Sequence, residues 1–397
     1  MSDQDVAGQA KRSFAERVGN VPVGGLVSLL GGGMAAGAVD LATGMPSAPA
    51  TDERLIEAAC AALRAGVNQY ENPAGNPELR AKIAAGFTTP ADPATEVTVT
   101  VGGTEALLTA LLSILNPGDE VVVFEPYYDN FLGTLSLAGA VPRFVELKAP
   151  KWRFEPESLK SVFGPRTKAV LLNSPHNPTG HMFSKDELEF IAGLCQKWNV
   201  TVISDEVYSW FTFDGREHLS VADIPALAER SIVVGSLSKS HALSGWRIGY
   251  LRAAPEITSV LRRVHIATTG GTTAPLQRAV LDARVLEPGV WNPAPELQKR
   301  RDSVTRIFTD AGLTCHVPDG GCYTMADIPV GHDGDCESYA SGLVASAGVL
   351  VVPSTILYDR RELGERRVRI AFNKAESVID EAERRLTGGS AAEEQPS

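Results

Sequence analysis

Short apolar runs alternate with amphipathic segments along most of the chain. Four runs are apolar on both faces and rich in β-branched residues, as central strands of a parallel sheet are; they lie at 121–124, 169–172, 200–203 and 232–234. Apolar residues at helical spacing fall between them, over 105–115 and 185–198. This alternation predicts an α/β fold with a mostly parallel central sheet.

The chain becomes rich in proline near 288–295, where we predict a domain boundary. Its 397 residues suit two domains better than one core. We expect an N-terminal arm and small-domain segment (1–45), a large domain (46–288), a small α+β domain (289–386) and a disordered tail (387–397).

The segment 21–39 carries no charge and could be mistaken for a membrane span. Its many glycines and Pro22 favour a loop or a short broken helix instead. We expect it to lie over a neighbouring surface, and we predict no membrane partner.

Composition narrows the classes of partner. The formal net charge of −11 and the lack of a basic run argue against nucleic acid. The five cysteines are scattered and form no CxxC pair, so we expect neither a metal site nor a disulfide framework. Residues 1–20 lack the apolar core of a signal peptide, and a cytoplasmic protein is the expectation.

Unusual residues follow the predicted strands, where α/β sheets bind ligands. The strings are VGGT at 101–104, NSPHNPTG at 173–180, SDEVY at 204–208 and GSLSKSH at 235–241. We therefore expect one site at this edge of the sheet.

Lys239 stands among several serines, and Gly245-Trp246-Arg247 follows it. A lone lysine in a loop is usually a surface residue. Near an arginine and oriented hydroxyls, however, a lysine can have a lowered pKa and attack an aldehyde. This setting makes Lys239 a candidate nucleophile.

Two further features have both a structural and a functional interpretation. Asp205 could be a helix N-cap, or its carboxylate could hold a cationic N–H of a bound ring. The glycines before Thr104 could form a simple turn, or their N–H groups at a helix start could hold a phosphate. Tyr208 could donate its O–H to a ligand oxygen.

Four strings together resemble the class I/II aminotransferases, which are fold-type I enzymes that use pyridoxal 5'-phosphate (PLP). They are SLSKSHALSGWRIG at 236–249, NSPHNPTG at 173–180, SDEVY at 204–208 and NQYENPAGNPELR at 68–80. The similarity extends from about Leu41 to Phe372, with the segments in the family's order. SxSK…GWRxG is its most specific part.

The resemblance implies a role for each matching residue. Lys239 would carry PLP as a Schiff base and move protons during the reaction. Asp205 would pair with the ring nitrogen. The other cofactor-binding residues would be Tyr208 and Asn177 on the ring oxygen, Tyr128 stacked on the ring, and Ser236, Arg247, Gly103 and Thr104 at the phosphate.

The resemblance also implies how substrate binds and how chains assemble. Arg369 would bind the substrate α-carboxylate, for which a guanidinium is well shaped; alone, it would be interpreted as part of a surface ion pair. Asn177 and Gly44 would lie beside that carboxylate. Taken alone, Tyr70 would be interpreted as a loop tyrosine that packs on its own domain. The resemblance implies instead that it reaches the phosphate of the neighbouring subunit, in a homodimer with shared active sites.

The sequence departs from the family at two places. Gly44-Met45-Pro46-Ser47 stands where many members read Gly-Glu-Pro-Asp, and Thr104 replaces a lysine that some relatives use for a second substrate carboxylate. The string EPYYD at 125–129 looks more like kynurenine, glutamine and methionine aminotransferases. A neutral or aromatic L-amino acid is therefore the expected donor, in a ping-pong exchange with a 2-oxo acid.

Two alternatives stay open. A PLP lyase or cyclase, such as a cysteine-conjugate β-lyase, would use the same cofactor residues. A non-catalytic PLP-sensing regulator would need a DNA-binding domain, and the roughly forty residues before the resemblance show no basic helix-turn-helix pattern.

Overall fold

The computed structural model describes residues 15–19, 21 and 37–388. Most of the segment 21–39 and nearly all of the tail from 387 onward lie outside these residues, so our predictions for them are untested. A short helix, α1 (Glu16–Gly19), lies against α6 (Asn130–Ala138), where Ser136 Oγ donates to Arg17 O over 2.9 Å.

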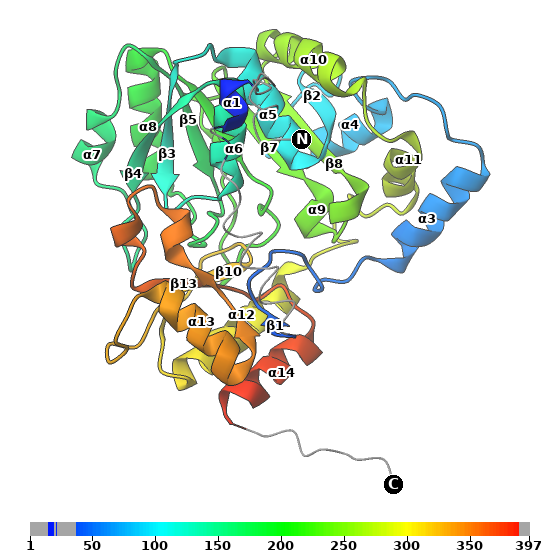
Figure 1. Cartoon of the computed structure of the whole chain (residues 1–397). Helices are drawn as coiled ribbons and strands as arrows, with labels where there is room; N and C mark the ends of the chain where they lie inside the picture. Colours follow the sequence, from blue (N-terminus) through cyan, green and yellow to red (C-terminus); the bar gives the residue numbers. More distant parts are fainter. Residues whose placement is uncertain (1–14, 20, 22–36, 389–397) are drawn as a thin grey trace, which may run out of the picture.

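A seven-stranded sheet forms the centre of the larger part of the molecule (Figure 1). Neighbouring strands are parallel except around β8, which is antiparallel to both its neighbours. In spatial order the strands are β2 (Val97–Val101), β8 (Ile248–Ala253), β7 (Ser231–Ser236), β6 (Thr201–Asp205), β5 (Thr167–Asn173), β3 (Glu120–Glu125) and β4 (Val141–Glu146). The predicted α/β class, the parallel-rich sheet and all four predicted strands are confirmed.

Alternate residues of each strand pack on opposite faces of this sheet, as the two-residue period of a strand requires. Val121 and Val123 join a core with α5, α6 and α10, whereas Val122 and Phe124 join a core with α7 and α8. These helices are α5 (Gly102–Ile114), α7 (Pro156–Ser161), α8 (Lys185–Trp198) and α10 (Pro255–Thr269). Because both faces are covered, the strands are apolar throughout, which is why they were recognisable in the sequence.

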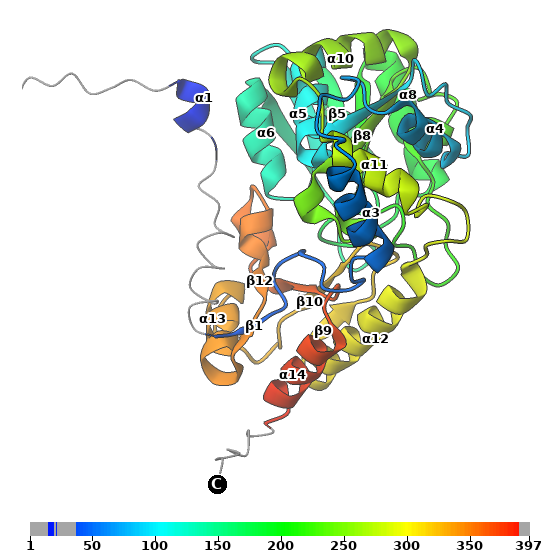
Figure 2. The same ribbon diagram turned by 90° about the vertical axis from the view of Figure 1, so that its right-hand side faces the viewer.

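A further layer of helices lies at the β2 end of the sheet. Residues of α4, α11, β2 and β8 share one apolar core, and α3 packs along α11. Figure 2 shows α3 and α11 side by side. The helices are α3 (Glu53–Arg64), α4 (Pro77–Ala85) and α11 (Ala274–Asp282).

The C-terminal part forms a second, antiparallel sheet with its own helices. The strand order is β12 (Val352–Pro353), β13 (Arg367–Ala371), β10 (Tyr323–Asp327) and β9 (Thr314–His316). Its helices α12 (Ala294–Asp310), α13 (Cys336–Ala347) and α14 (Glu376–Leu386) contribute to a shared core with β10 and β13. This is the expected mixture of helix and strand.

The N-terminal segment joins this C-terminal part. The two-residue strand β1 (Val39–Asp40) pairs in parallel with β11 (Val349–Leu350), so the blue segment runs beside red α14 in Figure 1. The chain then crosses to α3, in the helical layer beside the large sheet. The boundaries at 45/46 and 288/289 remain our proposed division of the chain.

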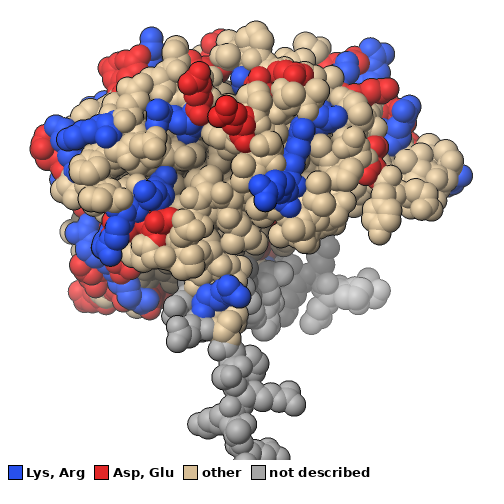
Figure 3. Space-filling view, turned by 90° about the horizontal axis from the view of Figure 1, so that it is seen from above, with Lys and Arg blue, Asp and Glu red and all other residues tan. Residues whose placement is uncertain are grey.

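Charged side chains of both signs are interspersed on the face seen in Figure 3. Among the described residues, no helix is both long and apolar enough to cross a lipid bilayer.

Candidate active site

A cavity of about 360 Å³ lies where the C-terminal ends of the parallel strands face the small sheet. Strand ends of the large sheet supply most of its wall, while Gly44 and Arg369 enter from the N-terminal segment and β13. Every predicted site residue except Tyr70 lines it: Gly44, Gly103, Thr104, Tyr128, Asn177, Asp205, Tyr208, Ser236, Lys239, Arg247 and Arg369. The fold therefore brings together residues that lie up to 325 positions apart, from 44 to 369.

Lys239 lies in a four-residue helix, α9 (Leu237–Ser240), directly after β7. Ser236 caps this helix, because its hydroxyl accepts from Ser238 N over 3.1 Å. Lys239 Nζ donates to Gly44 O over 2.8 Å. Burial lowers the pKa of Lys239, and the positive charges of Arg369, Lys374 and Arg247 lower it further. A larger fraction of the amine is thus neutral and nucleophilic.

Asp205 is the last residue of β6 and is 8% exposed. Within the described part of the chain, the one hydrogen bond of its carboxylate is from Val207 N to Oδ1, over 3.2 Å. Burial raises the pKa of Asp205 to about 7, since this single contact does not replace lost hydration. Its neighbour Glu206 is satisfied instead, because its carboxylate contacts Ser204, His218 and Val221 N.

The environment of Asp205 tests whether the site suits PLP. A buried carboxylate with one weak partner is matched by a cationic N–H, which a protonated pyridine ring would supply. The residues at the other end of the cavity suit a phosphate, as described next. On both grounds the residues present fit PLP.

The start of α5 and Arg247 form the cationic end of the cavity. Gly102 has φ of +74°, and a Cβ there would lie 2.5 Å from Arg247 Nη2. Glycine thus lets the guanidinium approach the first turn of the helix, whose free N–H groups favour an anion. Arg247 Nη1 donates to Ser244 O over 2.8 Å, which fixes the side chain.

Arg247 reaches this place because β8 runs against its neighbours. Strand β7 ends at Ser236 and β8 begins at Ile248, and their antiparallel pairing sets Ser236 opposite Gly249. The connection that holds Lys239 and Arg247 therefore stays at one edge of the sheet. A Cβ at Gly249 would come within 2.5 Å of Gly102 C, so that strand position also needs glycine.

Arg369 is 1% exposed and is held on three sides. Its Nη1 donates to Asn177 Oδ1 over 3.2 Å and its Nη2 to Ala42 O over 3.0 Å, while its Cζ lies 4.3 Å from the Tyr323 ring centroid. Its Nε is buried and has no hydrogen-bond partner among the residues that the structure describes. An unpaired donor on a fixed guanidinium suits a carboxylate entering the cavity.

The remaining wall is aromatic and amide-rich. Tyr208 is 5% exposed and lies 6.3 Å from Tyr323 between ring centroids. Burial raises the pKa of Tyr128 to about 12 and that of Tyr208 well above its usual value, so both stay protonated donors. Asn177 N donates to Asn173 Oδ1 over 2.6 Å, which positions the Asn177 side chain next to Arg369.

Tyr70 does not line the cavity. Its side chain is 95% exposed, in the irregular loop before α4. The interpretation that it packs on its own domain is therefore wrong for this chain. Its proposed contact with a neighbouring subunit is untested by a single chain.

Sequence reasoning missed two contributors to the site. Asn173 begins the NSPHNPTG string, and a buried amide at a strand end was an available signal; its Nδ2 donates to Asp205 O over 2.8 Å. Tyr323 had no sequence signal, because its role depends on the small sheet facing the large one. A Cβ at Gly44 would lie 1.8 Å from Tyr323 Oη, so this close approach requires glycine.

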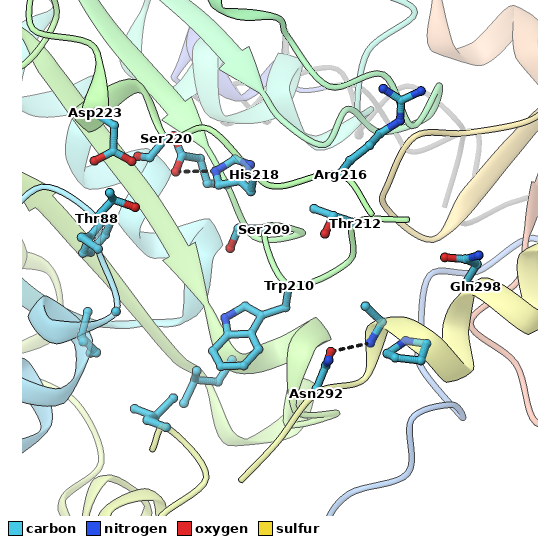
Figure 4. A pocket seen from close by; sticks show the side chains of 18 of the residues that line it. Thr88, Ser209, Trp210, Thr212, Arg216, His218, Ser220, Asp223, Asn292 and Gln298 are labelled. Atoms are coloured by element: carbon cyan, nitrogen blue, oxygen red, sulfur yellow. Dashed lines mark hydrogen bonds and ion pairs between the residues drawn. The ribbon is translucent and has the colours of Figure 1, made fainter. Parts of the chain in front are cut away.

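A second cavity, of about 710 Å³, lies between the segment 206–220 and the start of α12 (Figure 4). Trp210, Asn292 and Gln298 line it, but no predicted site residue does. We place the active site in the smaller cavity, because the buried Asp205 carboxylate, with its single hydrogen bond, and the cations of this cavity supply the required chemistry.

Comparison with known proteins shows the family of the chain. The family model for class I and II aminotransferases matches residues 36–386. A probable N-succinyldiaminopimelate aminotransferase from Mycobacterium tuberculosis is 36% identical over 371 residues, which cover 88% of this chain and 92% of the relative. Kynurenine–oxoglutarate transaminase 3 from Rattus norvegicus is 32% identical over 378 residues, covering 87% and 83%.

A solved structure gives the same result. An Escherichia coli protein with a methionine aminotransferase function superposes with a TM-score of 0.88 at 26% identity, covering 95% of this chain and 100% of that one. The fold is therefore that of a known transaminase.

Proposed function

This chain belongs to the class I and II aminotransferases, and we propose that it takes L-amino acids with neutral side chains, aromatic or methionine-like, as donors. It is a PLP-dependent aminotransferase that moves an amino group between an amino acid and a 2-oxo acid. The identity of the donor is the part that needs a further argument.

The number of positively charged side chains in the cavity supports the proposal of a neutral donor. Among the described residues that line it, the cations are Lys239, Arg247 and Arg369. Each has a role in the scheme below, and Thr104 supplies no fourth charge. A second substrate carboxylate would therefore be buried without a cation from this chain, which is costly. Two of the relatives above are named for kynurenine and for methionine, which lack a side-chain carboxylate. The first is also named for oxoglutarate, a dicarboxylate, so these names support the proposal for the donor and not for the acceptor.

The N-succinyldiaminopimelate relative is named for a substrate with more than one carboxylate. Such a donor would need a cation that the described lining does not provide. Because of this relative's name, donors with more than one carboxylate are included as a second class in the test below.

Each side chain takes a definite part in the proposed reaction. Arg369 and Asn177 bind the substrate α-carboxylate, which orients Cα toward Lys239. Lys239 Nζ would accept the substrate Cα proton and pass it on within the site. Tyr208 would donate a hydrogen bond to the ring oxygen of bound PLP, and Tyr128 would cover the ring and exclude water.

When bound, PLP supplies an electrophilic aldehyde and a cationic ring that takes up electrons from Cα. Asp205 would pair with the ring nitrogen and keep it protonated. Ser236, Arg247 and the first turn of α5 would hold the phosphate. The donor leaves as a 2-oxo acid before the acceptor binds, so the exchange is ping-pong.

Donor preference can be measured in the half-reaction. Single amino acids are added to holoenzyme without acceptor, and loss of the visible absorption of lysine-bound PLP is followed. We expect phenylalanine, kynurenine and methionine to react at least about tenfold more efficiently than aspartate, because burial of an unpaired carboxylate costs over 1.4 kcal/mol or so. The panel includes N-succinyldiaminopimelate.

Thr104→Lys is the matched variant, since it places a cation in the same cavity and should improve aspartate relative to phenylalanine. Aspartate leading in the wild-type panel would refute the proposal. The transamination half-reaction releases a 2-oxo acid and leaves the amino group on the cofactor. Release of ammonia together with the 2-oxo acid would instead indicate elimination.

We also propose that the protein is a homodimer whose active sites are shared. The exposed Tyr70 supports this, because a 95% exposed tyrosine next to α4 is free to contact another chain. A hydrogen bond from its hydroxyl to a phosphate would be worth roughly 1.5–3 kcal/mol. Tyr70→Phe should then weaken PLP binding by about one to two decades.

Shared sites predict complementation. Tyr70→Arg and Lys239→Ala, each of which we expect to be inactive alone, are mixed after reversible dissociation. A hybrid dimer then has one site with both lesions and one with neither, and about half of the dimers are hybrids. Activity should reappear on mixing. Confirmed hybrids that stay inactive would place Tyr70 in its own chain's site.

The free thiols of all five cysteines support a reducing compartment, and we propose the cytoplasm.

A further inference from the structure

Lys374 is buried outside the cavity lining and bonds to the segment 40–44, which enters the active site. Lys374 is 4% exposed and follows β13, which carries Arg369. Its Nζ donates to Asp40 Oδ2 over 2.8 Å and to Thr43 Oγ1 over 2.9 Å. Burial favours the neutral acid, but Lys374 and Thr43 outweigh it and lower the pKa of Asp40, which favours the carboxylate form.

Asp40 in turn shapes the turn that follows it. Its Oδ1 accepts from the N–H groups of Ala42 and Thr43, each over 2.9 Å, and its Oδ2 contacts the Thr43 hydroxyl. The backbone supports the same arrangement, because Ala371 N donates to Leu41 O over 2.7 Å. The turn is thus held by the Asp40 side chain, which belongs to it, and by Lys374, which bonds to it from the segment after β13.

The carbonyls of this turn contact two of the three cations among the described residues that line the cavity, Arg369 and Lys239. Ala42 O accepts from Arg369 Nη2 over 3.0 Å. Gly44 O accepts from Lys239 Nζ over 2.8 Å and from Asn373 Nδ2 over 3.2 Å. A shift of the turn therefore moves acceptors on which Arg369 and Lys239 depend.

We propose that Lys374 and Asp40 are positioning residues: their ion pair sets the carbonyls of Ala42 and Gly44, and through them the geometry with which Arg369 receives a substrate carboxylate. The inference rests on the proposed role of Arg369. It assigns a function to two residues that touch neither substrate nor cofactor. Geometric errors of about 1 Å at such a site can cost up to a hundredfold in rate.

The test compares Lys374→Met with wild-type holoenzyme. The probe is 3-phenylpropionate, which has a carboxylate but no amino group and so binds without reacting. We expect its Kd, measured by calorimetry, and the KM for phenylalanine both to rise at least tenfold, and kcat to fall less. Lys374→Arg should recover most of the affinity, because a guanidinium can also pair with Asp40.

Arg301→Met is the matched control, because Arg301 is another buried cation with carboxylate partners, Asp214 at 2.6 Å and Asp302 at 2.7 Å, outside the site. It should lower the melting temperature but leave Kd and KM unchanged. Folded Lys374→Met with wild-type Kd and KM would overturn the proposal. If that variant does not fold, Asp40→Asn decides: a rise of about threefold or more in Kd supports positioning, and an unchanged Kd refutes it. Wild-type enzyme that transaminates no neutral donor would refute the proposed function instead.

Discussion

Lys239→Ala should retain PLP through its phosphate but lose the visible absorption of the lysine-bound cofactor, with turnover reduced by more than about 10³-fold. The amine is held at the end of β7, 2.8 Å from Gly44 O, and burial lowers its pKa. No other lysine lines the cavity among the described residues, so no second amine can take over Cα proton transfer. Absorption spectra and single-turnover rates measure the two losses separately.

A small primary amine in the buffer should restore part of the rate in Lys239→Ala, since it can occupy the space vacated by the side chain. Lys197→Ala is the control, because Lys197 is exposed on α8 and should leave spectrum and rate unchanged. A persisting lysine-bound spectrum in Lys239→Ala would show that another residue holds the cofactor.

The sequence predicted the large sheet well because its signals are local. The four strands are apolar on both faces, and the predicted helix at 185–198 matches α8, whose start is defined by a capping box between Ser184 and Glu187. Helix α5 begins at Gly102, earlier than the predicted 105, because the two glycines already belong to its first turn. The antiparallel β8 was not foreseen, since its place depends on tertiary pairing.

The same distinction applies to the site. Lys239, Asp205 and Asn177 stand in contiguous strings at strand ends, where their residue types are conspicuous. Tyr323, Asp40 and Lys374 look ordinary in sequence. Their importance comes from contacts between segments that are distant in the sequence, such as Asp40 with Lys374 at a separation of 334. Local patterns cannot reveal such contacts.

Asp205→Ala should lower turnover by about 10²–10³-fold, the range found when one preorganised electrostatic partner is removed. Without the carboxylate the ring nitrogen loses its proton, and the ring becomes a poorer electron sink. Asp205→Glu should keep part of the activity. Glu206→Gln is the contrasting variant, because Glu206 already contacts His218, Ser204 and Val221 N and faces the other cavity. Near-normal rates in Asp205→Ala would contradict the role.

The apoenzyme offers an independent test of Asp205. Burial raises its pKa from 3.8 to about 7, so between these values the folded state binds a proton that the unfolded state does not. Stability from this group is present below pH 3.8 and is lost as pH rises toward 7, where it levels off. The melting temperature of apo Asp205→Asn should therefore increasingly exceed that of apo wild type between about pH 4 and 7. Because a cationic ring N–H stabilises the ionised carboxylate, adding PLP should stabilise wild type more at pH 8 than at pH 5. A difference in melting temperature between the two apoenzymes that does not change with pH would show that Asp205 ionises normally. It would contradict a site suited to a cationic ring.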